Sequence, residues 1–272
     1  MEMLPEFAAF LNANMGQIRS TEDWISGLSA SWDAHRPNYG FVLRENDRIT
    51  GGIGAIYAQR IIRGQMEKFC NITSWCVLDS HRKWSMPLAM AAVRQPGYHF
   101  TDFSPTKVVG GVLRFLKFKP LDEAIVVIPN GISPQLRGRI LSTPARIAEA
   151  LGGPALQIWL DHSNFHWLEH VLVGQPGNWC HLIYKRDRLK GLPSARILYR
   201  SNAAILERYL PRLAWHLLCR GLLTTQIERR FLSHLPRVCR LRTGFNPKLY
   251  LSSTLGDEDI DYLYSESMAL DL

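Results

Sequence analysis

Hydrophobic and polar positions in the first 130 residues change period several times, so the chain alternates between helix and strand patterns. Helical spacing over 4–15 and from Trp24 precedes strand patterns over 39–43, 49–62 and 69–78, and Gly51-Gly52 would allow a bulge in the second strand. The pattern then predicts a helix over 86–94, a strand over 99–103, a helix over 106–116 and a strand over 124–128. This order predicts an α/β fold of the α+β kind, with helices packed on one mixed sheet.

The pattern becomes less regular after Pro129-Asn130-Gly131, through about residue 154, and we expect a domain boundary there. The predicted domains are residues 1–130 and a second α/β domain over 131–272. Helical character near 156–173 is followed by strands over 179–184 and 195–199, with a basic turn over 185–191 between them.

Residues 203–220 form the clearest helical stripe of the chain, and a strand over 224–230 follows. Asn202 is the expected N-cap, and Gly221 the expected residue after the helix end. Pro211 should kink or split the helix. Strand, loop, helix and strand thus occur in the same order in both halves, which indicates either a degenerate internal repeat or the resemblance that any two α/β segments share.

Composition narrows the class of protein but not its function. Of 272 residues, 46% are hydrophobic and 21% charged, as in soluble globular proteins. The chain has 32 Lys and Arg against 24 Asp and Glu, which gives a formal net charge of +8. This charge suits anionic partners such as nucleotide cofactors, nucleic acid or acidic glycans, or it reflects an unspecific basic surface. The number of cysteines is odd and no pair has CxxC spacing, so we expect reduced thiols. We also see no basic secretory signal and no long apolar run, and we therefore predict a cytoplasmic protein.

The most informative stretch is ITSWCVLDSHRKWSMPL, from Ile72 to Leu88. An apolar strand runs into a short basic loop with hydroxyl groups, and the loop opens a helix. Free N–H groups and the helix dipole favour a phosphate at such a place. The stretch therefore predicts an anion-binding site.

The order of elements over roughly residues 20–130 resembles the GCN5-related N-acetyltransferase (GNAT) superfamily. In that family the strand that admits coenzyme A ends in Val, and an R/Q-x-x-G-x-G/A loop follows. Val77 and Arg82 match, whereas Ser85 and Pro87 stand where small residues are usual. The second half resembles, more weakly, two-part bacterial members found with surface-polysaccharide genes.

The resemblance implies that the protein is an enzyme that uses acetyl-CoA or another acyl-CoA as co-substrate. Val77 would hold the pantetheine arm through its backbone, and the diphosphate would be bound by Arg82, Lys83, Trp84 and Ser85. Ser85 can donate a hydroxyl hydrogen bond, and Pro87 suits the first helical turn. The alternative is a degenerate loop that is retained only for its fold.

The chemical step is harder to assign. Residues 112–118 resemble the family segment that ends in Leu-Gly-Phe, with Lys117 in place of Gly, and Leu113 stands where a proton-donating Tyr is frequent. The candidates for catalysis are Asp102, Ser104 and Asn71. Asp102 could act as a general base if burial raised its pKa, or it could cap the next helix, for which Ser104 is the better candidate. His81 is expected to face solvent.

Other constellations carry weaker signals. His162, His166 and His170 have i, i+4, i+8 spacing, but the expected helix has no HExxH motif, so we predict no metal site. The basic runs 185–190 and 237–242 lack a nucleic-acid-binding motif, and nucleic acid is an unlikely partner.

We therefore predict an acyltransferase that moves an acetyl or other short acyl group to an amine or hydroxyl. The acceptor would be a small molecule, sugar or peptide, and a homodimer is left open. The rival hypothesis is a non-catalytic binding or scaffolding protein with the same fold.

Overall fold

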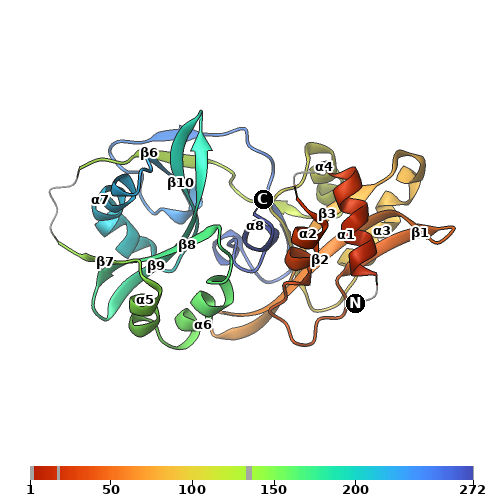
Figure 1. Cartoon of the computed structure of the whole chain (residues 1–272), viewed down its shortest axis with the longest axis horizontal. Coiled ribbons are helices and arrows are strands. Elements are labelled where there is room, and N and C mark those ends of the chain that lie inside the picture. The colour runs from red at the N-terminus through yellow and green to blue at the C-terminus, as the bar shows by residue number, and fades with distance from the viewer. Residues whose placement is uncertain (1–2, 17–18, 133–136, 272) are drawn as a thin grey trace. The chain divides into compact units, whose positions relative to one another are not determined.

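The computed structural model describes residues 3–16, 19–132 and 137–271, and this part of the chain forms two units, each built on its own mixed sheet (Figure 1). Unit 1 comprises residues 1–121 and 246–272, and unit 2 comprises residues 122–245. The predicted boundary at residue 130 is therefore wrong: the chain leaves unit 1 after Leu121 and returns to it at Asn246. The strand predicted over 124–128 exists but belongs to the sheet of unit 2.

The sheet of unit 1 has the strand order β1-β2-β3-β4-β13-β5. β1, β2 and β3 form an antiparallel meander, β4 is parallel to β3, and β13 lies antiparallel between β4 and β5. The bounds are β1 Gly40–Glu45, β2 Arg48–Ile62, β3 Gln65–Val77, β4 His99–Asp102, β5 Lys119–Pro120 and β13 Leu249–Leu251.

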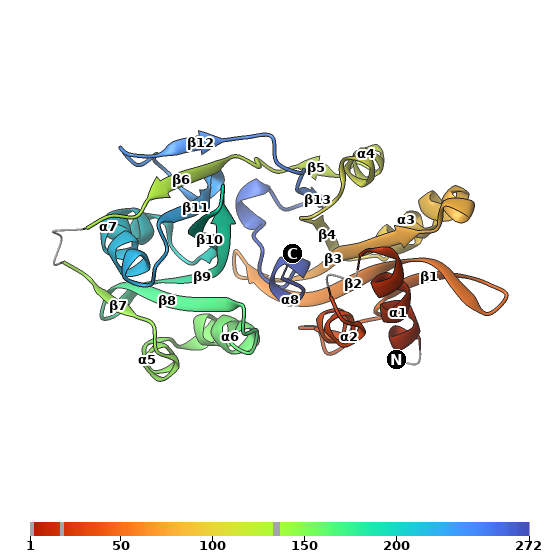
Figure 2. The same ribbon diagram turned by 45° about the horizontal axis from the view of Figure 1, so that its top comes forward.

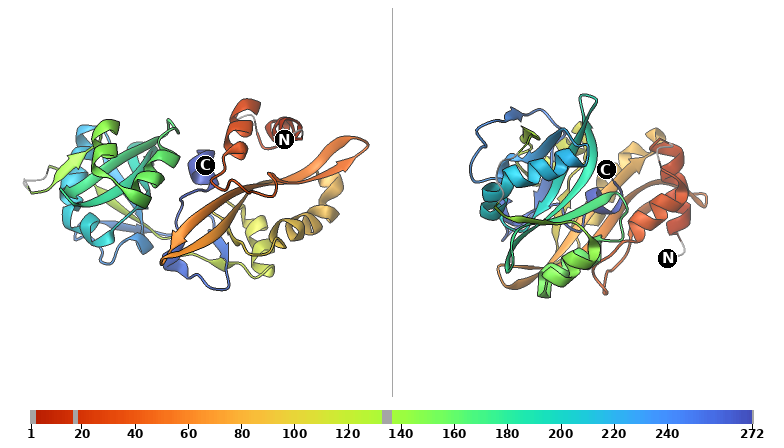
Figure 3. Two further views of the ribbon diagram at one scale, coloured as in Figure 1. Left: turned by 90° about the horizontal axis from the view of Figure 1, so that it is seen from below. Right: turned by 60° about the vertical axis from the view of Figure 1, so that its left-hand side comes forward.

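Helices cover both faces of this sheet, as Figures 2 and 3 show. Ile53, Tyr57 and Ile72 point to the face on which α3 and α4 pack, and a second cluster with Phe7 and Leu28 joins α1 and α2 to the other face. The alternation of strand side chains explains how one sheet supports two cores. The helices are α1 Leu4–Asn14, α2 Thr21–Ser29, α3 Ser85–Val93, α4 Lys107–Phe115 and α8 Glu266–Ala269.

Unit 2 has the strand order β7-β8-β9-β10-β11-β6-β12. Its meander β8–β9–β10, the crossover helix α7 and the parallel pair β10–β11 follow the same order as β1–β2–β3, α3 and β3–β4. That unit 2 is a degenerate repeat of an acyl-CoA-binding domain stays a prediction. The bounds are β6 Ile125–Pro129, β7 Arg139–Leu141, β8 Leu168–Gln175, β9 Asn178–Leu189, β10 Leu192–Arg200, β11 Thr224–Glu228, β12 Arg240–Arg242, α5 Pro144–Ala150, α6 Gly153–His162 and α7 Ala203–Cys219.

Two predictions for the second half are wrong. The expected helix near 156–173 ends at His162, and residues 168–175 form β8, because Leu168, Val171 and Val173 are needed in the core of the sheet. The expected basic turn over 185–191 is mostly strand, and only Lys190-Gly191 turns. Helix α7 is confirmed, with Asn202 as N-cap, and it continues through Pro211. Residues 133–136 of the stretch expected to be irregular lie outside the described part.

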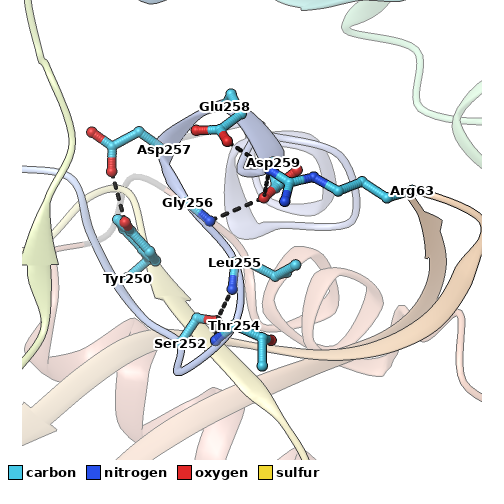
Figure 4. A network of polar contacts seen from close by, with 9 residues as sticks. All are labelled: Arg63, Tyr250, Ser252, Thr254, Leu255, Gly256, Asp257, Glu258 and Asp259. Atoms are coloured by element: carbon cyan, nitrogen blue, oxygen red, sulfur yellow. Dashed lines mark hydrogen bonds and ion pairs between the residues drawn. The ribbon is translucent and has the colours of Figure 1, made fainter.

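The segment that returns to unit 1 is tied to the β2–β3 hairpin by ion pairs (Figure 4). The guanidinium of Arg63 at the hairpin turn lies 2.5 Å from a Glu258 carboxylate oxygen and 2.9 Å from one of Asp259. Arg63 is largely exposed, so these contacts add little stability. Arg60 is better shielded and pairs with Asp261 at 2.7 Å. This pair is screened less by salt than the exposed contacts of Arg63 are.

Helix α4 ends in a Schellman motif, with an unusual residue at its left-handed position. The Phe118 N–H donates to the Leu113 carbonyl at 3.0 Å, and Lys117 has φ +71°. Glycine adopts this conformation without a steric penalty, whereas a residue with a Cβ does not. The Leu-Gly-Phe resemblance thus locates the helix end correctly, and Lys117 occupies the position that favours glycine.

We expect Lys117→Gly to stabilise unit 1. Glycine relieves the left-handed strain but also raises the conformational entropy of the unfolded chain. The free energy of unfolding should therefore rise by about 0.5–1 kcal/mol. Urea unfolding would measure this change. The control Lys107→Gly, in the first turn of the same helix, should destabilise, and a loss of stability in both variants would contradict the explanation.

Candidate active site

The candidate site of unit 1 lies where β3 and β4 separate. The two strands pair only from Phe69↔His99 to Asn71↔Thr101, after which β4 ends at Asp102 and β3 continues to Val77. Ser74 has φ +53°, and the β2–β3 register shifts between Gly52 and Gly54. Two residues of β3, Ser74 and Trp75, thus lie opposite Ile53 alone, so the bulge of this pair is on β3 and not on the second strand, where Gly51-Gly52 were expected to allow one. Bulges bend strands.

A pocket of about 880 Å³ lies beside the divergent end of β3. One side is formed by the end of β3 and the 3₁₀ turn Asp79–Trp84, and the other by α4. Three of the predicted cofactor-binding residues, Val77, Arg82 and Ser85, line it, whereas Lys83 and Trp84 lie in the same turn but not on the pocket wall. The remaining lining residues are Asn14, Trp75, Cys76, Leu78, Asp79, Ser80, Thr106, Val108, Val109 and Val112.

The basic turn differs in detail from the prediction. The Arg82 guanidinium pairs with the Asp79 carboxylate at 2.7 Å, so its charge is already matched in part. His81 was expected to face solvent, but its side chain is only 17% exposed and lies between Ser80 and Glu45, 2.7 and 3.0 Å away. Pro87 stands in the first turn of α3, as expected.

The three predicted catalytic residues meet around a fourth that the sequence did not reveal, Glu266 of α8. The Phe103 N–H donates to Glu266 Oε1 at 2.8 Å, and the Ser104 hydroxyl donates to the same oxygen at 3.1 Å. Asn71 Oδ1 accepts the Glu266 N–H at 2.8 Å, while its Nδ2 donates to the Thr101 hydroxyl at 3.0 Å. Thus α8 is anchored at the start of the divergence.

Asp102 and Glu266 form a buried pair of carboxyl groups. Asp102 is 4% exposed and Glu266 is not exposed at all. Burial raises the pKa of Asp102 well above its ordinary value, and the neighbouring Glu266 raises it further. Burial also raises the pKa of Glu266, and its hydrogen bonds from Phe103 and Ser104 oppose that rise only in part. Two like charges share one dry site, so the pair retains a proton above the usual range of carboxylic acids.

Neither Asp102 nor Ser104 caps α4, so the alternative role as helix cap, which the sequence left open for both residues, is wrong. The cap is Thr106, whose hydroxyl accepts the Val109 N–H at 3.3 Å. The Ser104 N–H instead donates to Asp102 Oδ1 at 3.2 Å. Because Ser104 is exposed and its hydroxyl reaches Glu266, it connects the buried pair with the surface.

The histidines considered for a metal site are dispersed. His162 ends α6, His166 is exposed in the following turn, and His170 lies on β8 next to His181 of β9, with 3.1 Å between ring nitrogens. Burial lowers the pKa of His170 to about 4 and that of His181 to about 3. Over residues 3–16, 19–132 and 137–271, no group of three His, Cys, Asp or Glu side chains is arranged to hold a metal ion.

Comparison with solved structures decides the fold. A GCN5-related N-acetyltransferase from Anabaena variabilis aligns with 92% of this chain and 70% of its own, at 12% identity and a TM-score of 0.63. The chain has the fold of the GCN5-related N-acetyltransferases. A putative acetyltransferase from Pyrococcus horikoshii aligns over 97% of this chain and 90% of its own, with 11% identity and a TM-score of 0.53.

An N-myristoyltransferase from Saccharomyces cerevisiae, solved with bound myristoyl-CoA and inhibitors, also shares the GNAT fold. It aligns with 97% of this chain and 82% of its own, at 11% identity and a TM-score of 0.51. No protein-family model matches the chain, and no curated protein sequence does. Among the described residues, no helix is long and apolar enough to cross a membrane.

The proton that the Asp102–Glu266 pair retains should make the stability of the protein depend on pH. The folded pKa values lie above the unfolded ones, so between about pH 4 and the raised values the folded state binds more protons, and stability falls as pH rises. Glu266→Gln removes one carboxyl group and its repulsion of Asp102. We expect the variant to gain stability over the wild type between pH 5 and pH 8, by about 1.4 kcal/mol for each unit of pKa shift removed.

Hydrogen exchange of the β3 and β4 amides, with both proteins compared at each pH, would measure this gain. Glu22→Gln changes an exposed carboxylate of α2 and serves as the matched control. Equal pH dependence in the wild type and Glu266→Gln would show that the pair holds no additional proton.

Proposed function

We propose that this protein is an acyltransferase that moves an acetyl or other short acyl group from acyl-CoA to an amine or hydroxyl acceptor. The observation that carries the proposal is the pocket of about 880 Å³ between the divergent end of β3 and α4, within a GNAT fold. The yeast N-myristoyltransferase of the same fold binds an acyl-CoA, which supports this class of donor.

The pocket offers suitable contacts for a pantetheine arm. β2 pairs with one edge of β3 up to Val77, and β4 leaves the other edge after Asn71. Backbone groups on that edge can bind the amides of the arm as another strand would. The turn with Arg82 and Ser85 then lies at the position for the diphosphate, where a guanidinium binds phosphate oxygens well.

In the transfer step, the acceptor nitrogen or oxygen attacks the thioester carbonyl carbon. A C–N or C–O bond forms, the C–S bond breaks, and the CoA thiolate leaves. We assign removal of the acceptor proton to the Asp102–Glu266 pair, with Ser104 as the hydroxyl that reaches the exposed side. A base with a raised pKa is suited to accept a proton near neutral pH. Leu113 has an aliphatic side chain without an ionisable proton, so it cannot protonate the thiolate.

A non-catalytic binding protein is the second candidate, and the ion pair between Arg82 and Asp79 favours it. A carboxylate that is 88% exposed on the pocket wall repels a diphosphate. Binding and turnover separate the two candidates, because a scaffold without chemistry would not consume a thioester.

Calorimetric titration with acetyl-CoA and free CoA tests the cofactor site. We expect micromolar binding that weakens about 10–100-fold in Arg82→Ala, the loss typical of one charge-assisted contact. Asp79→Asn should tighten binding because it removes a like charge. Arg48→Ala, at an exposed position of β2, is the matched control. No binding by the wild type would refute the proposed function.

Thioester consumption tests the chemistry. Asp102→Asn and Glu266→Gln keep the shape of each side chain and remove its ability to accept a proton. Each should slow acetyl-CoA turnover by about 10²–10⁴-fold while CoA affinity is unchanged. Release of free thiol gives the rate, and Glu22→Gln is again the control. Unchanged turnover in both variants would remove the carboxylate pair from the mechanism.

A further inference from the structure

Helix α4 exposes an apolar stripe at the mouth of the candidate pocket. Val108 is 72% exposed and Phe115 is 73% exposed, and the two share a helix face with Gly111. Val108 also lines the pocket, so the stripe begins at its edge. Trp84 lies in the 3₁₀ turn that borders the opposite side of the pocket, although not on the pocket wall, and is 50% exposed. An exposed apolar stripe that begins at the edge of a pocket indicates a surface that another molecule covers.

Basic side chains accompany these apolar residues. Lys107 and Arg114 are exposed on α4, and Lys83 precedes Trp84 in the 3₁₀ turn. These three form no ion pair with any residue in the described part of the chain, whereas Arg82 is matched by Asp79. The two elements that border the pocket therefore carry an excess of positive charge next to these apolar residues. An acidic protein partner with an apolar contact would complement both properties.

The pocket itself is better suited to a pantetheine arm than to the rest of coenzyme A. Beyond the end of β3, Asp79 competes for Arg82, and Pro87 has no N–H to offer a phosphate. The support for a diphosphate is thus reduced, while the strand edge that would bind the arm is intact. The stripe from Val108 to Phe115 extends over two turns of α4, more than one adenine ring can cover.

We propose that the preferred acyl donor is an acidic carrier protein that bears the acyl group on a phosphopantetheine arm. The carrier would dock on Val108, Phe115 and Trp84, with Lys83, Lys107 and Arg114 facing its acidic side chains. The arm would enter the pocket along β3. This proposal rests on the proposed acyltransferase function and specifies its donor.

The chemistry is that of the proposed transfer, with a different leaving group. The acceptor nitrogen or oxygen bonds to the acyl carbon, the C–S bond of the arm breaks, and the acceptor proton passes to the carboxylate pair. The thiol stays on the carrier protein. The reaction requires no further reactant.

Calorimetry with a bacterial acyl carrier protein tests the proposal. The full-length chain would be titrated with the holo form, the apo form and free CoA at the same ionic strength. We expect the holo form to bind about tenfold more tightly than CoA, and the apo form to bind more weakly than the holo form because it lacks the arm. Affinity for the carrier should fall as salt is raised.

Variants of the stripe identify the docking surface. Phe115→Ser should weaken binding of the holo carrier about tenfold, as loss of an interface aromatic does, and leave CoA binding unchanged. Lys107→Glu and Arg114→Glu should weaken the carrier further as the charge reverses. Ile61→Ser, another exposed apolar residue of unit 1, is the control and should affect neither ligand.

Each remaining outcome has a distinct meaning. If CoA binds and the holo carrier does not, the carrier proposal is overturned and the acyltransferase proposal stands. If Phe115→Ser weakens CoA and carrier equally, the stripe binds the adenine of CoA, and the carrier proposal is again overturned. If neither donor binds, the proposed function itself fails.

Discussion

Everything at the candidate site depends on the early separation of β3 and β4. Parallel strands that paired along their whole length would leave no room for a ligand, and their backbone groups would be satisfied within the sheet. Here a short β4 and a bulge at Ser74 open the sheet after Asn71. One consequence is the pocket beside β3, and another is the space in which α8 places Glu266. The candidate binding pocket and the candidate carboxylate pair thus have one structural origin.

The sequence predicts unit 1 well up to about residue 121, where the signals are local, and misses β13 and α8, which the chain adds after residue 246. Apolar, largely β-branched and aromatic residues indicate β2 and β3, Pro87 and the basic turn mark the start of α3, and the segment before Phe118 marks the end of α4. The same local signals select Asp102, Ser104 and Asn71, which the structure brings together. Their catalytic role and the binding roles of Val77, Arg82 and Ser85 stay predictions, since geometry shows position and not activity.

Glu266 was not found in this way, because no local signal in the sequence gives it a chemical role. Its significance comes from contacts with Asn71 and Phe103, which lie far away in the chain. The error near 156–173 has another cause: histidines at helical spacing and aromatic neighbours looked like one helix, whereas the core of unit 2 required a strand from Leu168. Tertiary packing overrode local periodicity there.

Unit 2 interrupts unit 1 in the chain, and this arrangement has a consequence for biosynthesis. Residues 122–245 are contiguous, so unit 2 can fold as soon as they leave the ribosome. Unit 1 cannot insert β13 between β4 and β5 until residues 249–251 have been made. Glu266 arrives later still. The carboxylate pair is therefore assembled only after residue 266 has been made, so the candidate site is incomplete in shorter nascent chains.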